Sequence, residues 1–406
     1  MIGKTTAEYS MFHLKLLLLI VLTLLASGCK QPTETEFEPP SYYHPYSVIK
    51  TAENTYIIAG EHYYYGIRKG FLLEFDDAGN LLWTKEYPPP ENHYTRSFFR
   101  VKHLRDGNFV AVGYGEGDFT GYQGVFGMLV ALIDRNGNKI WENLYFIGSN
   151  VGHFAHDVEE TANGELIVVG RVGTVGFTPF PWSDALILKL NREGNKLSEK
   201  QFRDYDSFDA IVKSSDGNFI IGGSAIAKVD SNLNVIWHLP LEGENVKIMT
   251  GGNVQIKRTG NTEYVVSVVK YLPSYVITIY RIDESGNILS SFDYQCDTGV
   301  VRSARLEVDG DNYIIAYVCM DNPYNETRHQ LFILKADKNG NIVWKKLIRE
   351  RRVEDGGIYS YPFIKAADGN YILILEEPIP GKSRNELVAI KFDREGNILW
   401  QKRLLP

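Results

Sequence analysis

Side chains that could do chemistry are few and scattered in this sequence. His153 and His156 have a spacing that could serve a metal ion, but no helical pattern holds the two imidazoles on one side and no third ligand stands out. Asp204, Asp206 and Asp209 could serve a glycosidase or lyase, although carboxylates in surface loops are usually only solvated. The sequence has no Gly-x-Ser-x-Gly, phosphate-loop or zinc-protease motif. We therefore expect no metal and no cofactor, and we assign no catalytic residue.

Aromatic and polar side chains between the apolar segments suit recognition of a sugar or a peptide. The alternative is that each of them packs against a neighbouring loop. The candidate ligand-binding residues are Trp182, Phe180, Tyr64, Tyr122, His153, His156, Tyr205, Tyr324 and Arg351.

One repeated phrase, Asp-x-x-Gly-Asn-x-x-Trp, organises the elements that must position these residues. Its seven copies begin at Asp76, Asp134, Asn191, Asp230, Asp283, Asp337 and Asp393. An Asp that starts a type I turn accepts a backbone N–H two residues later, and a Gly three residues on can take a positive φ, so each copy predicts a hairpin turn. A calcium loop is the alternative, but the acidic residue that closes such a loop is missing. Five of the six tryptophans occupy the last position, after an apolar residue, which predicts an outer strand buried on both faces.

The spacing of the copies predicts the architecture. Successive turns are 58, 57, 39, 53, 54 and 56 residues apart, and a second tight turn, such as Asp106-Gly107-Asn108, precedes most copies. Repeats of this length with four strands are typical of propeller blades. We therefore expect an all-β, seven-bladed β-propeller of four-stranded antiparallel blades over residues 47–406, in which blade seven closes directly on blade one.

The start of the chain reads as a targeting segment. Lys4 and Lys15 precede an apolar run from Leu16 to Leu25 that is short for a permanent membrane helix. The run ends in Leu25-Ala26-Ser27-Gly28-Cys29, which resembles the lipobox of bacterial lipoproteins, and the resemblance implies that Cys29 carries lipid. An ordinary cleaved signal is the alternative. We expect a signal peptide at residues 1–28, a lipidated Cys and flexible tether at 29–46, and anchoring at the outer membrane, because Lys30 rather than Asp follows the Cys.

The repeats also resemble the quinoprotein-like propeller repeats of bacterial envelope lipoproteins, in which an Asp-containing turn and a Trp-bearing strand recur. The resemblance covers residues 47–406 and implies the fold. The vicinal Cys pair and calcium site of the quinone-dependent dehydrogenases are not found in this sequence, so a quinone cofactor is not expected.

In antiparallel blades, both tight turns of every blade lie on one face, and the loops that vary from blade to blade lie on the other. We call these the tight-turn face and the variable-loop face, and we expect the tight-turn face to be inert. Blade four lacks one variable loop almost entirely, which predicts a notch beside Trp182. Cys296 and Cys319 reach the variable-loop face in adjacent blades, and an oxidising envelope would permit a disulfide between them.

These observations favour a monomeric binding or scaffold module that takes a protein, peptide or glycan through its variable-loop face. The alternative is a glycan-active hydrolase or lyase that uses the same face. The formal charge is −7, and removal of the first 28 residues, which carry a net +1, leaves about −8. An acidic chain argues against a nucleic-acid partner, and the lipid on Cys29 would be the sole link to the membrane.

Overall fold

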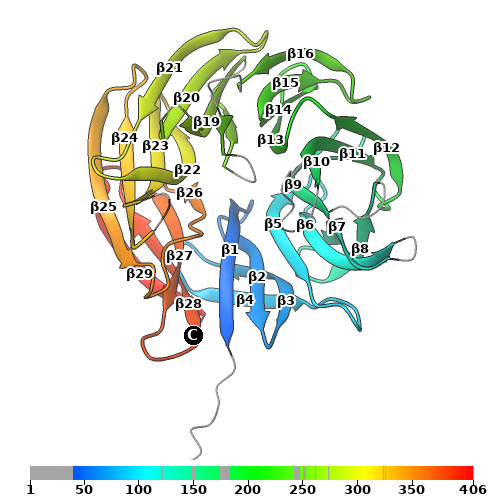
Figure 1. Cartoon of the computed structure of the whole chain (residues 1–406), viewed down its shortest axis with the longest axis horizontal. Helices are drawn as coiled ribbons and strands as arrows, with labels where there is room; N and C mark the ends of the chain where they lie inside the picture. Colours follow the sequence, from blue (N-terminus) through cyan, green and yellow to red (C-terminus); the bar gives the residue numbers. More distant parts are fainter. Residues whose placement is uncertain are drawn as a thin grey trace, which may run out of the picture. The chain divides into compact units, whose positions relative to one another are not determined.

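The computed structural model describes residues 40–119, 122–147, 152–173, 183–241, 247–249, 253–260, 262–272, 274–322, 324 and 326–405. The predicted signal peptide, Cys29 and most of the predicted tether lie outside these residues. Residues from Pro40 onward form one compact unit, a ring of seven antiparallel sheets around an axis (Figure 1). The unit is a seven-bladed β-propeller, as the repeat predicts.

The first four blades each contain four strands. Blade one contains β1 (Ser41–Lys50), β2 (Tyr56–Tyr64), β3 (Ile67–Phe75) and β4 (Leu81–Tyr87). Blade two contains β5 (Arg96–His103), β6 (Phe109–Phe119), β7 (Tyr122–Ile133) and β8 (Lys139–Tyr145). Blade three contains β9 (Gly152–Glu160), β10 (Leu166–Gly173), β11 (Ser183–Leu190) and β12 (Lys196–Phe202). Blade four contains β13 (Phe208–Lys213), β14 (Phe219–Gly223), β15 (Ala225–Val229) and β16 (Val235–Pro240).

The last three blades complete the ring. In blade five the innermost strand is split into β17 (Lys247–Ile248) and β18 (Gln255–Arg258), which both pair with β19 (Glu263–Leu272), and β20 (Val276–Asp283) and β21 (Ile288–Tyr294) follow. Blade six contains β22 (Val300–Asp309), β23 (Asn312–Met320), β24 (Arg328–Ala336) and β25 (Ile342–Arg352). Blade seven contains β26 (Phe363–Lys365), β27 (Tyr371–Pro378), β28 (Asn385–Phe392) and β29 (Ile398–Leu405).

The repeated phrase forms the turn between the third and fourth strands of each blade. In the copy of blade two, the N–H of Gly137 donates to the carbonyl of Asp134 at 2.9 Å, and Gly137 has a φ of 77°. The Asp134 carboxylate accepts the backbone N–H groups of Asn136 and Asn138 at 2.9 and 2.7 Å, as well as the Asn138 side-chain amide at 2.9 Å. The carboxylate is thus fully engaged in the turn.

Each tryptophan of the phrase joins its own blade to the next one. A Cβ atom added to Gly137 would lie 2.9 Å from Trp83 of blade one, and one added to Gly79 would lie 3.0 Å from Trp400 of blade seven. Glycine is therefore required at this position for two reasons: its φ is positive, and the indole of the neighbouring blade leaves no room for a Cβ atom. The Nε1–H groups of Trp141 and Trp237 also donate to carbonyls of the following turn, at 3.0 and 3.1 Å.

The outer strands are less buried than the sequence predicts. The tryptophans are half-buried, and the apolar residue before each one is exposed; Ile140, for example, is 53% exposed. The expectation that both faces are buried was wrong, because only the face with the Trp meets a neighbouring blade. The cores lie between adjacent blades, among residues of the inner three strands.

Blade seven closes on blade one without exchanging a strand, and β1 begins at Ser41, earlier than the expected start of the propeller at residue 47. The early part of β1 contacts blade seven. The side-chain amide of Asn385 accepts from the Tyr43 N–H at 2.7 Å and donates to the Tyr43 carbonyl at 2.9 Å. The Ser41 N–H donates to the Ser383 carbonyl at 2.9 Å.

Candidate functional site

Two depressions lie on the variable-loop face. The blade-six groove has a volume of about 930 Å³ and is lined by Asp321, Glu326, Thr327, Arg328 and residues 350–355. The blade-seven pocket has a volume of about 530 Å³ and is lined by Tyr42, Arg351, residues 354–356, residues 377–382 and Arg384. The two depressions share Arg351, Glu354 and Asp355, so they form one continuous hollow.

Arg351 lines both the groove and the pocket. Its Nη2 lies 2.6 Å from a carboxylate oxygen of Glu377, and its Nη1 donates to the carbonyls of Glu376 and Gly357 at 2.7 and 3.2 Å. Burial lowers the pKa of Arg351, against the opposing effect of Glu377. The structure thus places this predicted residue at the hollow, where Glu377 already pairs with its charge.

Asp321 lines the blade-six groove and is exposed. Its carboxylate accepts the backbone N–H groups of Thr327 and Arg328 at 2.9 and 3.1 Å, and the bond from the Thr327 side chain is the main cause of a lowered Asp321 pKa. These bonds fix the loop that leads into β24. Tyr324 lies on this loop with 94% of its surface exposed, and it does not line the groove.

A group of tyrosines continues the surface onto blade one. This blade-one tyrosine cluster consists of Tyr42, Tyr63, Tyr64 and Tyr65. The rings of Tyr42 and Tyr63 stack with centroids 6.4 Å apart, and Tyr64 and Tyr65 are 37% and 63% exposed. Lys69 lies 5.5 Å from the centre of the Tyr64 ring. Because Tyr42 also lines the blade-seven pocket, the cluster and the hollow are adjoining parts of one face.

The two candidate histidines are buried and have partners within the propeller. His153 is buried, and its ring nitrogens contact the carbonyl of Phe126 at 3.1 Å and the backbone of Ile147 at 2.8 Å. His156 is also buried, with Nδ1 3.1 Å from Asp209. Within the described residues, no three His, Cys, Asp or Glu side chains come together in a way that could hold a metal ion.

Ser207, His156 and Asp209 meet in the core but are not arranged as a catalytic triad. The Ser207 hydroxyl lies 3.1 Å from His156 Nδ1 and donates to Asp209 at 2.7 Å, so serine and carboxylate both face the same ring nitrogen. In a triad the two groups bind opposite nitrogens and the hydroxyl reaches substrate. Here Ser207 and Asp209 are fully buried, which also corrects the expectation that Asp209 is solvated.

Among the remaining candidates, Tyr205 has a described side chain, and it does not line the hollow. Tyr205 packs against Phe202 and Phe208 between blades three and four, and burial raises its pKa. Phe180 and Trp182 lie outside the described residues, and of Tyr122 only the backbone is described, at the start of β7. The loop missing from blade four is reduced to Ser224, as expected.

Cys296 and Cys319 form a disulfide with a Cα–Cα distance of 5.9 Å. The bond joins the end of blade five to β23 of blade six. It lies within a core that also contains Tyr294 and Tyr317.

Sequence reasoning missed the residues around the axis. A β-bulge in each of several innermost strands shifts the register at one residue, which is Tyr46 in β1, Phe99 in β5 and His156 in β9. The strand opposite each bulge carries a glycine; a Cβ on Gly113 would lie 2.0 Å from the Ser97 carbonyl. A glycine in the middle of an apolar strand is the signal that could have predicted these bulges.

Comparisons with known proteins agree with the fold. No family model and no curated protein matches the chain. The BP39L lectin from Burkholderia pseudomallei matches with a TM-score of 0.59 at 7% identity, over 90% of this chain and 99% of the lectin. A protein of unknown function from Dyadobacter fermentans matches at 12% identity over 86% of this chain and 94% of its own, with a TM-score of 0.48. Another from Bacteroides caccae matches at 14% identity over 76% and 94%, with a TM-score of 0.40.

The described residues contain no helix with the length and apolar character needed to span a bilayer.

Proposed function

We propose that this protein is a binding module of the bacterial envelope that takes a glycan or a peptide on its variable-loop face. The observation that carries the proposal is the continuous hollow over blades six and seven, bordered by the blade-one tyrosine cluster. Tyrosine rings stack on sugar rings and on apolar peptide groups, and the charged residues of the groove supply hydrogen bonds that fix orientation. The similarity in fold to a lectin supports this class of function.

The alternative, a glycan-active hydrolase or lyase, would need free carboxylates in the hollow. Three acidic side chains of the groove instead lie against an Arg or His side chain. Glu350 lies 3.6 Å from Arg328, Glu354 lies 3.0 Å from Arg352, and Glu326 lies 2.7 Å from His329. Such pairing suits recognition better than proton transfer.

A screen of the purified protein on a glycan array, with a peptide pull-down in parallel, tests the proposal. We expect a bound ligand whose affinity falls at least tenfold in the Tyr64→Ala, Tyr65→Ala double variant. Leu82→Ala, which truncates an exposed side chain on the outer strand β4, is the matched control and should bind normally. Binding that survives in the double variant and in Arg328→Ala would place the ligand elsewhere, and release of cleaved sugar would favour the enzyme.

The lipid anchor is a separate part of the proposal and rests on the motif that ends in Cys29. Incorporation of labelled palmitate in bacteria, lost in Cys29→Ser, would support it. A water-soluble, unlabelled protein with an unmodified mature terminus would refute the anchor without bearing on the ligand.

A further inference from the structure

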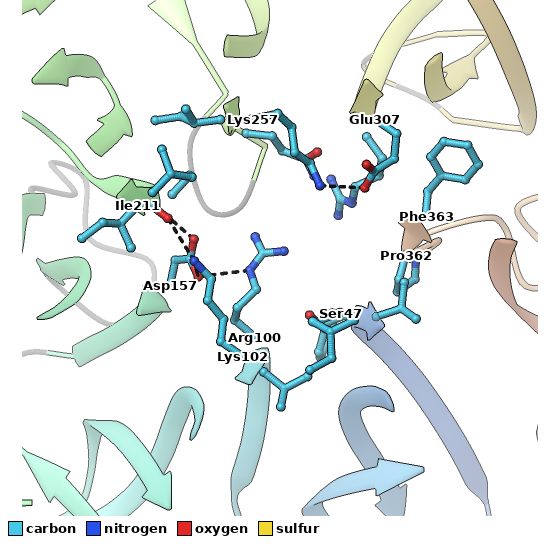
Figure 2. Close-up of a pocket in the computed structure, with 18 of the residues that line it drawn as sticks. Ser47, Arg100, Lys102, Asp157, Ile211, Lys257, Glu307, Pro362 and Phe363 are labelled. Atoms are coloured by element: carbon cyan, nitrogen blue, oxygen red, sulfur yellow. Dashed lines mark hydrogen bonds and ion pairs between the residues drawn. The ribbon is translucent and has the colours of Figure 1, made fainter. Parts of the chain in front are cut away.

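A cavity of about 380 Å³ lies on the axis of the propeller and is lined by the innermost strands of all seven blades (Figure 2). Its lining runs from Tyr46, at the bulge of β1, to Lys50 and His103, the exposed last residues of β1 and β5. Tight turns follow both of these strands, so the cavity extends to the tight-turn face. It is thus distinct from the hollow on the variable-loop face.

The lining is rich in basic side chains, although the chain as a whole is acidic. Five lysines and arginines line the cavity against three carboxylates; these residues are Lys50, Arg100, Lys102, Lys257, Arg305, Asp157, Glu159 and Glu307. The excess of positive charge around the axial space concentrates anions there.

Two of the lysines are neutralised by neighbouring carboxylates. Lys102 Nζ lies 3.2 Å from Asp157 and 2.7 Å from Glu159, and Lys257 Nζ lies 2.6 Å from Glu307. Burial alone lowers the pKa of Lys102, but the two carboxylates outweigh it, so the pKa is raised. All three acidic side chains of the lining thus already lie within hydrogen-bond distance of a lysine.

Arg100 extends from β5 into the open centre of the cavity (Figure 2). Its Nε is buried and has no hydrogen-bond acceptor among the described residues, since the nearest carboxylate oxygen, on Asp157, is 3.7 Å away. A buried donor without an acceptor is costly, and in native structures it commonly marks an unseen water, ion or ligand.

Arg305 reaches the same cavity from β22, on the far side of the ring. It donates to the carbonyl of Ala304 at 2.9 Å, and its guanidinium lies 5.4 Å from the centre of the Tyr361 ring. Burial lowers the pKa of Arg305, and although Tyr361 and Asp209 oppose this effect, the charge of Arg100 adds to it. Arg100 and Arg305 thus bring two like charges to one cavity.

We propose that the axial cavity binds a small oxyanion, a phosphate or carboxylate group, between Arg100 and Arg305. An anion would accept a hydrogen bond from Arg100 Nε and reduce the repulsion between the two guanidinium groups. The planar guanidinium group presents its N–H donors in a geometry that matches the oxygens of a phosphate or carboxylate. A water occupies about 30 Å³ in the liquid, so the cavity has the volume of roughly a dozen waters. That space suits a small anion and excludes a macromolecule.

Isothermal titration calorimetry of the purified protein with inorganic phosphate, and separately with malonate, tests the site. The buffer contains no other oxyanion, and sodium chloride keeps the ionic strength constant. We expect one saturable site per chain, with affinity reduced at least tenfold in Arg100→Gln and in Arg305→Gln. Arg203→Gln, which changes an exposed arginine between β12 and β13, is the matched control and should bind normally. Preference for phosphate or malonate identifies the head group.

Arg100→Lys serves as a second variant, because it keeps the positive charge and loses the planar set of N–H donors. We expect its affinity for the anion to lie between those of the wild type and Arg100→Gln. Thermal melts of the wild-type chain add a measurement that does not depend on the variants, since phosphate should raise the melting temperature more than chloride at equal ionic strength. The proposal is overturned if neither anion binds saturably at tens of millimolar, or if binding is unchanged in both glutamine variants.

Discussion

The pairing of a glycine with an indole is the smallest unit that holds this ring together. Where the pairing fails, other residues fill the space. In blade three the Trp position is Ser198, and the glycine that would face it in blade four is Leu233, which is buried with a φ of 68°. The nearby Lys200 Nζ donates to the Leu233 carbonyl at 3.1 Å, as expected if β12 lies against this turn. In blade five, where Ser290 replaces Trp, Phe292 covers Gly340 instead.

Leu233 and Ser198 stand where other blades have Gly and Trp, so we expect substitutions at these two positions to have coupled effects on the free energy of unfolding. Leu233→Gly removes a buried side chain, a loss of about 2–5 kcal/mol. Relief of the left-handed backbone offsets about 1–2 kcal/mol of it. We expect urea denaturation to show a net loss of about 1–3 kcal/mol, partly restored by adding Ser198→Trp. A variant as stable as wild type, or effects that simply add, would show that the two positions do not face each other.

At the scale of strands, the sequence predicts what depends on local patterns. The turn residues predict the hairpins, and the spacing of the turns predicts the blades. The seven sheets and the two faces could therefore be predicted. The bulges at Tyr46 and Phe99 could not, because they depend on how the opposite strand packs. The position of the hollow could not be predicted for a similar reason. It forms where the segments that follow β25 and β27 lie together, and neither segment has a distinctive sequence of its own.

The disulfide is the covalent link between two neighbouring blades. In the chain-entropy model, a disulfide between residues 23 apart in sequence lowers the entropy of the unfolded chain and thereby stabilises the folded protein by about 3 kcal/mol. We expect the Cys296→Ser, Cys319→Ser variant to lose stability of this order in chemical denaturation. Dithiothreitol should destabilise the wild-type protein but not the double serine variant. An equal change in the stability of the two proteins would show that the disulfide does not form.

At the scale of the whole molecule, the contact between blades one and seven decides whether the ring stays closed. His44 Nδ1 on β1 lies 2.6 Å from Glu376 on β27. Burial lowers the pKa of His44, but the hydrogen bond to Glu376 and the charges of Glu376 and Glu61 outweigh it, even against Arg68, so the pKa is raised. The contact is therefore strongest when His44 is protonated.

This raised pKa predicts how closure depends on pH. A group whose pKa is higher in the folded state stabilises the fold fully below its unfolded pKa, about 6.5 for His, and the effect is lost as pH rises through the folded value. We expect the stability difference between wild type and His44→Gln to shrink between pH 6 and pH 9, by about 1 kcal/mol or less. Urea midpoints at each pH measure this difference. A difference that stays constant or grows would contradict the assigned pairing.

We propose that ligand binds the variable-loop face over blades six, seven and one. Hydrogen–deuterium exchange of the protein with and without the captured glycan or peptide tests it most directly. We expect slower exchange in residues 350–357, 377–385 and 63–68, with no change in the turns at 134–138 and 393–397. Protection confined to those turns would contradict it.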